Sequence, residues 1–328
     1  MSLPITFKRA VFKAANEPLT IEETPMITPA PNEVLVKVEA CGVCYSDKYA
    51  QMNAMGGGFP LVPGHEIIGR VVALGSSSIT NWTVGDRVGG AWHGGHDGTC
   101  HACRAGHFQM CDNGLVNGVT RNGGYAEYCT LRAEAAVPVP EDVDAAKYAP
   151  ILCAGVTMFN SLRRQRIPVG ETVAVQGLGG LGHLAIQYAN KFGYRVVALS
   201  RGKDKESFAR SLGAHHYIDT TDGDAGEQLR ALGFASLVMT TVPDAAALPG
   251  LLKGLGPEGK LLIISVPGDI TINTGALVSF SSFSTVAPLE RRTVCADRSG
   301  HSFITVFQSS RGRLDMLRTR PTLFASRS

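Results

Sequence analysis

From about residue 171 onward, short apolar runs alternate with stretches of helical spacing. "ETVAVQ" (171–176) and "RVVALS" (195–200) are continuous apolar runs of strand length, and "HHYID" (215–219) is a shorter one. Between them, "LGHLAIQYANKFG" (181–193) and "KESFARSLGA" (205–214) repeat apolar residues with the helical period. Strands that alternate with helices predict a parallel sheet with crossover helices, an α/β fold.

The first half of the chain has a different pattern. Runs such as "EVLVKVEA" (33–40) and "IIGRVVAL" (67–74) are rich in β-branched residues and lie among glycine-rich stretches. This combination is typical of strands joined by tight turns. The sequence therefore predicts a β-rich first domain, with the boundary to the α/β domain near residues 150–165.

Composition restricts the possible functions. The 328 residues suffice for two domains, and 44% hydrophobic with 18% charged residues is ordinary for a globular protein. The net charge of +3 is small and scattered, which argues against nucleic-acid binding, and no apolar run reaches the length of a membrane span. The N-terminus lacks the pattern of a secretory signal, so we expect a cytoplasmic protein whose eight cysteines are metal ligands or buried thiols.

A glycine fingerprint lies between the first strand and the first helix of the predicted α/β domain. "GLGGLG" places Gly177, Gly179 and Gly182 in the G-x-G-x-x-G pattern, with Gly180 and Leu181 completing the turn. In this context the glycines allow a tight turn, a close approach of the pyrophosphate and close packing of helix on strand. The helix N-terminus would favour the bound anion. We expect a dinucleotide site here.

The end of the second strand predicts which dinucleotide binds. NAD sites usually carry an acidic residue at this place, whereas this chain has Ser200, followed by Arg201, Lys203 and Lys205. A hydroxyl group and cations suit a 2′-phosphate, which a carboxylate would repel. The missing acid favours NADP(H) over NAD(H), although a solvated basic turn would look the same.

Cysteine and histidine residues form two candidate metal sets. Cys44, His65 and Cys153 would supply the two thiolates and one imidazole of a catalytic zinc site with an open position. Their wide spacing is no signal by itself, because scattered residues of this kind are more often buried thiols and core histidines. A closer set, Cys100, Cys103 and Cys111, has zinc spacing but needs a fourth ligand.

The stretch "GHEIIGRVVALGSSSITNWTVGDRV" carries a family resemblance. With its Gly-His-Glu, Gly69, Gly75 and Gly85-Asp86, it resembles the zinc-containing alcohol dehydrogenases of the medium-chain dehydrogenase/reductase superfamily, nearest to microbial and cinnamyl-alcohol-type NADP-dependent members. The resemblance runs from about residue 6 to about residue 278. It implies a GroES-like β-rich catalytic domain (1–155, with a structural-zinc lobe at about 93–113) and a Rossmann doubly wound parallel sheet (156–278).

The resemblance also implies roles for individual residues. Cys44, His65 and Cys153 match the catalytic zinc ligands, and Glu66 matches a carboxylate that can approach the metal. Asp47 matches the residue that orients the ligand histidine. Ser46 matches the hydroxyl that takes the alcohol proton, but Tyr49 stands where the relay often ends in a histidine, so we expect proton release directly to water.

The same resemblance supplies a fourth ligand for the second set. The family's four-cysteine spacing places its first cysteine at Asp97, so that the structural site would be Asp97, Cys100, Cys103 and Cys111. Carboxylate oxygen is an acceptable zinc ligand. His93, His96 and His101 are rivals, and we favour Asp97 because it preserves the register of the loop.

Together these features predict a zinc-dependent alcohol dehydrogenase or carbonyl reductase. It would hold two zinc ions per chain and transfer hydride between NADP(H) and a small alcohol, aldehyde or ketone. The relatives implied by the resemblance are homodimers or homotetramers. A zinc-independent enoyl or quinone reductase and a weakly active or non-catalytic NADPH- and zinc-binding variant are the alternatives.

The last segment, 279–328, departs from the family pattern. It holds ten serines, eight arginines and no lysine, and only "HSFITVFQ" (301–308) has the character of a strand. This abrupt change of composition suggests a shifted reading frame or an alternative splice. We expect lower stability and activity than in a full-length relative, with the last ~30 residues mobile.

Overall fold

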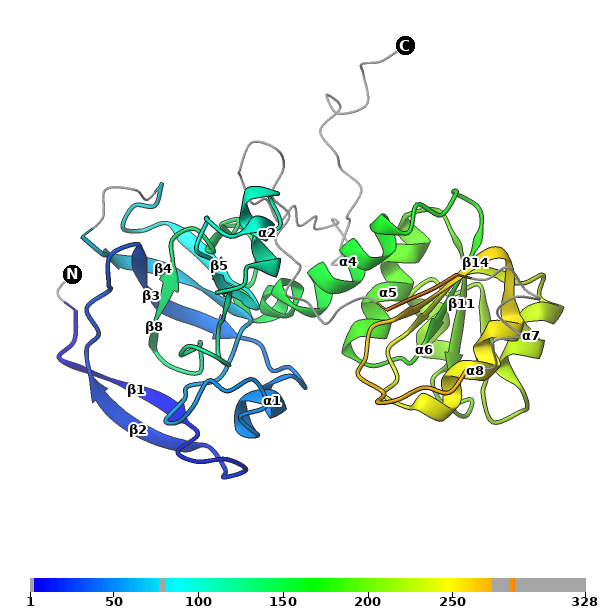
Figure 1. Ribbon diagram of the computed structural model, residues 1–328, viewed down its shortest axis with the longest axis horizontal. Coiled ribbons are helices and arrows are strands. Elements are labelled where there is room, and N and C mark those ends of the chain that lie inside the picture. Colours follow the sequence, from blue (N-terminus) through cyan, green and yellow to red (C-terminus); the bar gives the residue numbers. More distant parts are fainter. Residues whose placement is uncertain (1–2, 77–80, 273–282, 287–328) are drawn as a thin grey trace, which may run out of the picture. The chain divides into compact units, whose positions relative to one another are not determined.

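The computed structural model describes residues 3–76, 81–272 and 283–286. The chain folds as two compact units (Figure 1). The first is built on residues 1–156, and the second begins at Thr157. Within the described residues, no helix combines the length and the apolar character that a membrane crossing requires.

The first unit is mainly β-structure, as its β-branched runs among glycine-rich stretches predicted. Its largest sheet has five antiparallel strands in the order β8-β3-β4-β5-β9. The inward side chains of β3, β4 and β5 include Val36, Ile67 and Val88, which are all fully buried. Burying each such side chain stabilises the fold by about 1.5–3 kcal/mol. The strands are β1 (Thr6–Val11), β2 (Thr20–Pro25), β3 (Glu33–Cys41), β4 (Ile67–Leu74), β5 (Arg87–Gly90), β6 (His93–Gly95), β7 (Leu115–Val116), β8 (Tyr128–Arg132) and β9 (Val137–Pro138).

Short helices connect these strands, and residues of both candidate metal sets lie in them or close to their first residues. Helix α1 begins directly after Ser46, and α2 begins directly after Cys100. Helix α4 begins directly after Cys153. The helices are α1 (Asp47–Gln51), α2 (His101–Arg104), η1 (Phe108–Met110), α3 (Ala145–Tyr148), η2 (Ala149–Leu152) and α4 (Ala154–Arg164).

The second unit is an α/β fold with a parallel sheet. Its strand order is β12-β11-β10-β13-β14-β15, and every neighbouring pair is parallel. The order reverses at β10, because β11 lies on one side of it and β13 on the other, which is where doubly wound sheets bind ligands. The strands are β10 (Thr172–Gln176), β11 (Arg195–Ser200), β12 (His216–Asp219), β13 (Ala235–Thr240), β14 (Leu255–Ile263) and β15 (Phe283–Val286).

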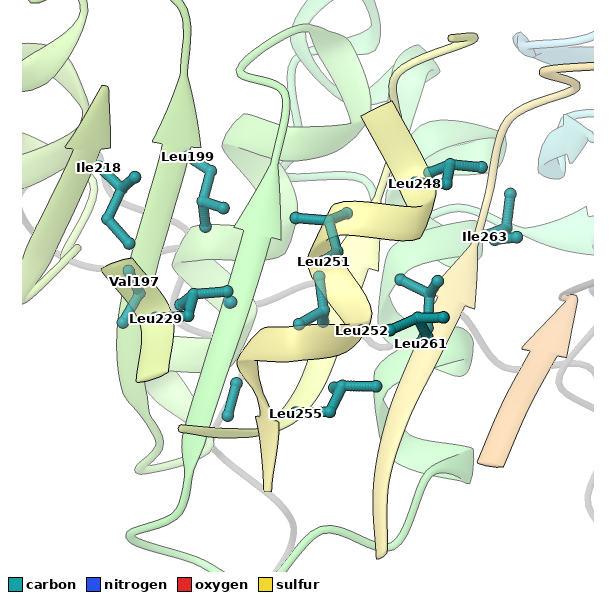
Figure 2. Packing of buried hydrophobic residues seen from close by; sticks show 13 residues of the cluster. Val197, Leu199, Ile218, Leu229, Leu248, Leu251, Leu252, Leu255, Leu261 and Ile263 are labelled. Carbon is teal, nitrogen blue, oxygen red and sulfur yellow. The ribbon is translucent and has the colours of Figure 1, made fainter. Parts of the chain in front are cut away.

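Helices cover both faces of this sheet, which explains its continuous apolar strands. On one face, Leu229 of α7 and Leu251 of α8 pack against Val197 and Leu199 of β11 (Figure 2). The alternate residues of β11, Val196 and Ala198, are also fully buried, and α5 contacts both β10 and β11. The helices are α5 (Gly180–Lys191), α6 (Glu206–Ser211), α7 (Ala225–Ala231), η3 (Ala245–Ala247), α8 (Leu248–Leu251) and η4 (Leu252–Gly254).

The predicted fold class, β-rich unit followed by a doubly wound parallel sheet, is confirmed. One expectation about the final segment is wrong: a strand occurs at Phe283–Val286 and pairs with β14, although we expected strand character only at 301–308. This strand forms because its backbone hydrogen-bonds to the edge of the sheet at β14, and no alternating pattern in the sequence predicts it. The 301–308 stretch and the expected mobility of the last residues lie outside the described residues.

Candidate active site and nucleotide site

Four side chains from distant parts of the first unit meet in one cluster. Cys44 lies between β3 and α1, His65 and Glu66 directly precede β4, and Cys153 directly precedes α4. One possible ligand atom from each of these residues lies within 4.8 Å of all the others. The two sulfur atoms of the pair Cys44 and Cys153 are 3.8 Å apart. The structure therefore brings together all three residues of the first predicted metal set.

The imidazole of His65 is fully buried in this cluster. Its Nδ1 lies 3.4 Å from Oδ1 of Asp47, and neither ring nitrogen makes a hydrogen bond to another described residue. The ring of Trp92 packs edge-on against it, with 4.9 Å between the ring centroids. A buried nitrogen without a partner is costly, so Nε2 is an atom that a bound group would satisfy.

The charges in the cluster favour a cation. The hydrogen bond with Cys153, together with His65, lowers the pKa of Cys44 to about 4, so this thiol is ionised at neutral pH. Burial would lower the pKa of His65, but Asp47 and Cys44 raise it to about 9. A metal ion bound at Nε2 would face the negative charge of Cys44.

Glu66 is also buried at this place. Burial raises the pKa of its carboxyl group to about 7, and its Oε2 has no hydrogen-bond partner in the described part of the chain. A Cβ atom on Gly42 would lie only 1.9 Å from this oxygen. Glycine at position 42 therefore lets the loop after β3 pack directly against the carboxylate.

Asp47, the first residue of α1, is held by two donors. Its Oδ2 accepts hydrogen bonds from the backbone N–H of Cys44 (3.0 Å) and from the hydroxyl of Tyr125 (2.7 Å). Burial opposes ionisation, but His65 and these donors lower the pKa of Asp47 below its ordinary value. Ser46 precedes α1, and its backbone N–H lies 3.5 Å from the sulfur of Cys44. Asp47 and Ser46 thus border the cluster.

The donor set of the cluster fits zinc. Two thiolate sulfurs and one imidazole nitrogen are the ligands of a Cys₂His zinc site, which leaves a position for substrate or water. The fit is supported by Nε2 of His65, which has no hydrogen-bond partner in the part of the chain that the structure describes, and by the lowered pKa of Cys44. Soft thiolate ligands argue against magnesium or calcium.

A second cluster lies in the loop that carries α2. Ligand atoms of Asp97 and the three thiols Cys100, Cys103 and Cys111 lie within 4.8 Å of one another. Each carboxylate oxygen of Asp97 already accepts hydrogen bonds: Oδ1 from the backbone N–H groups of Thr99 (2.7 Å) and Cys100 (3.0 Å), and Oδ2 from the side chain of Asn113 (2.7 Å). The carboxylate is thereby fixed beside the thiols.

The histidine rivals of Asp97 have other contacts. Nε2 of His93 lies 3.0 Å from Nδ1 of His96, and the ring of His96 stacks on Phe108 at a centroid distance of 4.3 Å. His101 is an exposed residue at the start of α2. Among the described residues, the group of possible ligands around the three thiols contains Asp97 and none of these histidines.

The glycine loop between β10 and α5 has the geometry of a phosphate-binding turn. Gly177 has a φ of +92°, which favours glycine, and a Cβ atom on Gly182 would lie 1.7 Å from the carbonyl oxygen of Gly177. By contrast, a Cβ on Gly179 or Gly180 would meet no atom within 4 Å. The turn therefore needs glycine for packing at one point and leaves open space at the N-terminus of α5, beside Leu181.

The turn after β11 is held from the neighbouring strand. Ser200 ends β11 and is paired with Asp219 of β12, and Arg201 is exposed. Oδ1 of Asp219 accepts a hydrogen bond from the backbone N–H of Gly202 (2.8 Å), and the hydroxyl of Tyr217 donates to the carbonyl of Gly202 (2.6 Å). The backbone N–H and the carbonyl of Gly202 are thus both hydrogen-bonded, two residues after Ser200. Lys205 follows directly before α6.

The sequence interpretation missed three residues near these sites. Tyr125 contacts Asp47, and Asp219 holds the turn after Ser200. Thr241 lies against Gly177, because a Cβ atom on Gly177 would be 2.5 Å from Oγ1 of Thr241. Thr241 directly follows β13, and carboxyl ends of neighbouring parallel strands lie together. That rule could have pointed to Thr241 and to Asp219, the last residue of β12, whereas no pattern marks Tyr125.

Known proteins share these features. The profile of the alcohol dehydrogenase GroES-like domain matches residues 30–141, and that of the zinc-binding dehydrogenase matches residues 180–317. The alcohol dehydrogenase notN of Aspergillus sp. (strain MF297-2) is 62% identical over 280 residues, which cover 85% of this chain and 82% of that protein.

Solved structures agree with the sequence matches. A zinc-binding dehydrogenase of Sinorhizobium meliloti 1021, bound to NADP, has a TM-score of 0.78 at 25% identity and covers 86% of this chain and 84% of its own. An acetophenone reductase of Geotrichum candidum, in complex with NAD, has a TM-score of 0.73 at 27% identity, with 87% and 83% covered. This chain belongs to the zinc-type alcohol dehydrogenases of the medium-chain dehydrogenase/reductase superfamily.

Proposed function

We propose that this alcohol dehydrogenase binds two zinc ions per chain and uses NADP(H) in preference to NAD(H). A catalytic ion would be held by Cys44, His65 and Cys153, and a structural ion by the lobe cluster of Asp97 with three thiols. The observation that carries the catalytic assignment is the fully buried imidazole of His65, which lies with two thiols and a carboxyl group and whose Nε2 has no hydrogen-bond partner among the described residues.

The residues around this cluster would divide the work of the reaction. A zinc ion supplies a Lewis acid that polarises the oxygen of an alcohol, aldehyde or ketone, and the nicotinamide accepts or donates hydride. Asp47 orients His65 through its Oδ1, 3.4 Å from Nδ1. We assign to the hydroxyl of Ser46 the role of accepting the alcohol proton.

The onward path of that proton differs from a histidine relay. Tyr49 lies on α1, three residues after Ser46, and burial raises the pKa of its hydroxyl above 10. A phenol with such a pKa is a poor base at neutral pH. We therefore propose that the proton passes from Ser46 to water.

The NADP(H) preference is proposed from the turn after β11. Ser200 occupies the place of the usual acidic residue, and Arg201 and Lys205 add positive charge without a described ion-pair partner. Asp219, the carboxylate nearest in register, has Oδ1 occupied by three donors from Gly202 and Thr221. One compared structure holds NADP and the other NAD, so this turn carries the proposal.

Metal analysis combined with steady-state kinetics tests the proposal. Purified protein should contain about two zinc ions per chain and reduce aldehydes with a kcat/KM about 10- to 100-fold higher for NADPH than for NADH. Cys44→Ser and His65→Ala should lose one zinc ion and turnover while retaining NADPH binding. Cys129→Ser is the matched control, because this buried thiol lies in the sheet core and outside both clusters.

The alternatives give different results. A zinc-independent enoyl or quinone reductase would keep its activity after chelation and in His65→Ala. A non-catalytic variant would bind NADPH and zinc without oxidising the cofactor on any aldehyde of the panel. Equal kcat/KM values for the two cofactors would refute the assignment of the turn at Ser200.

A further inference from the structure

The segment Asn122–Tyr125, of sequence "NGGY", is clasped to the residues that precede His65. It runs alongside Val62–Gly64 and is joined to it by four hydrogen bonds between 2.7 and 3.0 Å. The donors and acceptors are Gly123 N to Val62 O, Gly124 N to Gly64 O, Tyr125 N to Pro63 O, and Val62 N to Oδ1 of Asn122.

Close packing reinforces this clasp. Gly64 has a φ of +96°, and a Cβ atom on it would lie 2.5 Å from the ring of Tyr125. A Cβ atom on Gly124 would lie 3.0 Å from the sulfur of Cys41. The aromatic ring therefore abuts the backbone that immediately precedes His65.

The hydroxyl of the same residue reaches the carboxylate that faces the imidazole of His65. It donates a 2.7 Å hydrogen bond to Oδ2 of Asp47, while Oδ1 of Asp47 lies 3.4 Å from Nδ1 of His65. Burial and the neighbouring carboxylate raise the pKa of Tyr125, so its hydroxyl stays a donor. Without this donor, the backbone N–H of Cys44 would be the remaining described partner of Oδ2.

We infer that Tyr125 is a positioning residue for the catalytic metal, acting through Asp47 on His65. Its ring fixes the backbone before the histidine, and its hydroxyl fixes the carboxylate that faces Nδ1. Partners of a ligand histidine orient its ring and raise its basicity, and losing them typically costs metal affinity. The inference rests on the proposed zinc site and adds a residue two contacts away from the ligand His65.

Tyr125→Phe is the decisive variant, because it removes the hydroxyl and keeps the ring that packs against Gly64. Zinc release from purified protein to a chromogenic chelator would be followed over time, and Cys44→Ser would identify the phase that belongs to the catalytic site. We expect this phase to be about 10-fold faster in Tyr125→Phe, with the lobe phase unchanged. The ligand-field absorption of cobalt(II) bound in place of zinc should also shift.

Tyr194→Phe is the matched control, since its hydroxyl donates a 3.1 Å bond to the carbonyl of Ile167 in the second unit. This control should release zinc at the wild-type rate. Equal release rates and equal cobalt spectra in wild type and Tyr125→Phe would overturn the role of Tyr125. If Cys44→Ser shows the same phases of zinc release as wild type, the proposed zinc site itself is refuted.

Discussion

Replacing Gly182 by alanine would place a methyl group 1.7 Å from the carbonyl oxygen of Gly177. Because the clash is with backbone, α5 must shift away from the end of β10. Overpacking of this kind costs about 1–3 kcal/mol, and alanine in a helix returns about 0.5–1 kcal/mol of it. We expect a net loss of up to about 2.5 kcal/mol, which lowers Tm by about 2–4 °C per kcal/mol.

Gly180→Ala separates packing from phosphate binding in the same turn. A Cβ at Gly180 meets no atom within 4 Å, so this variant should keep or slightly raise Tm. If the pyrophosphate binds in the open space at Gly180, the Gly180→Ala protein should nevertheless bind NADPH more weakly than wild type. Differential scanning calorimetry and isothermal titration with NADPH measure the two effects. A stable Gly182→Ala with wild-type NADPH affinity would contradict the packing role of Gly182.

Three further predictions concern other parts of the chain. Asp97→Ala should lose one zinc ion and lower Tm, as metal analysis and calorimetry would show; full zinc content, with loss in His96→Ala instead, would rule out Asp97 as the ligand. Arg87→Ala should lower the free energy of unfolding by about 2–3 kcal/mol in a urea titration, because the buried guanidinium binds Glu39 and the carbonyls of Pro140 and Val143; a loss near zero would refute this. The backbone N–H and the hydroxyl of Thr221 lower the pKa of Asp219 below its ordinary value of 3.8. The ionised carboxylate therefore stabilises the folded protein fully above that value, and this contribution is lost as pH falls through the folded-state pKa. The Tm difference between wild type and Asp219→Asn should therefore be constant near neutral pH and narrow below about pH 4; a gap that widens in acid would show the opposite sign.

The second unit was the part most open to prediction from sequence. Its strands are buried on both faces and its helices are amphipathic, so the change of period along the chain indicated the elements from 171 to 219. The strand Phe283–Val286 was missed because its place depends on the free edge of β14, which a local pattern does not record.

The candidate active site was predictable for a different reason. Cys44, His65 and Cys153 lie far apart in the sequence, and their spacing alone is uninformative; the family resemblance named them, and the structure places them together. Tyr125 could not be found in this way, because its contact with Asp47 depends on how the segment Asn122–Tyr125 packs against Gly64. Contacts between distant segments are the information that local sequence patterns lack.

The hydrogen bonds of Asp97 bear on the order in which the lobe is assembled. Through Thr99, Cys100 and Asn113, this carboxylate ties the start of the thiol-bearing loop to its end. These hydrogen bonds reduce the entropy of the open loop in addition to any ion that the thiols bind. Loss of the ion alone need not open the loop. Such a chain would tolerate zinc scarcity better than one whose loop is closed by the ion alone.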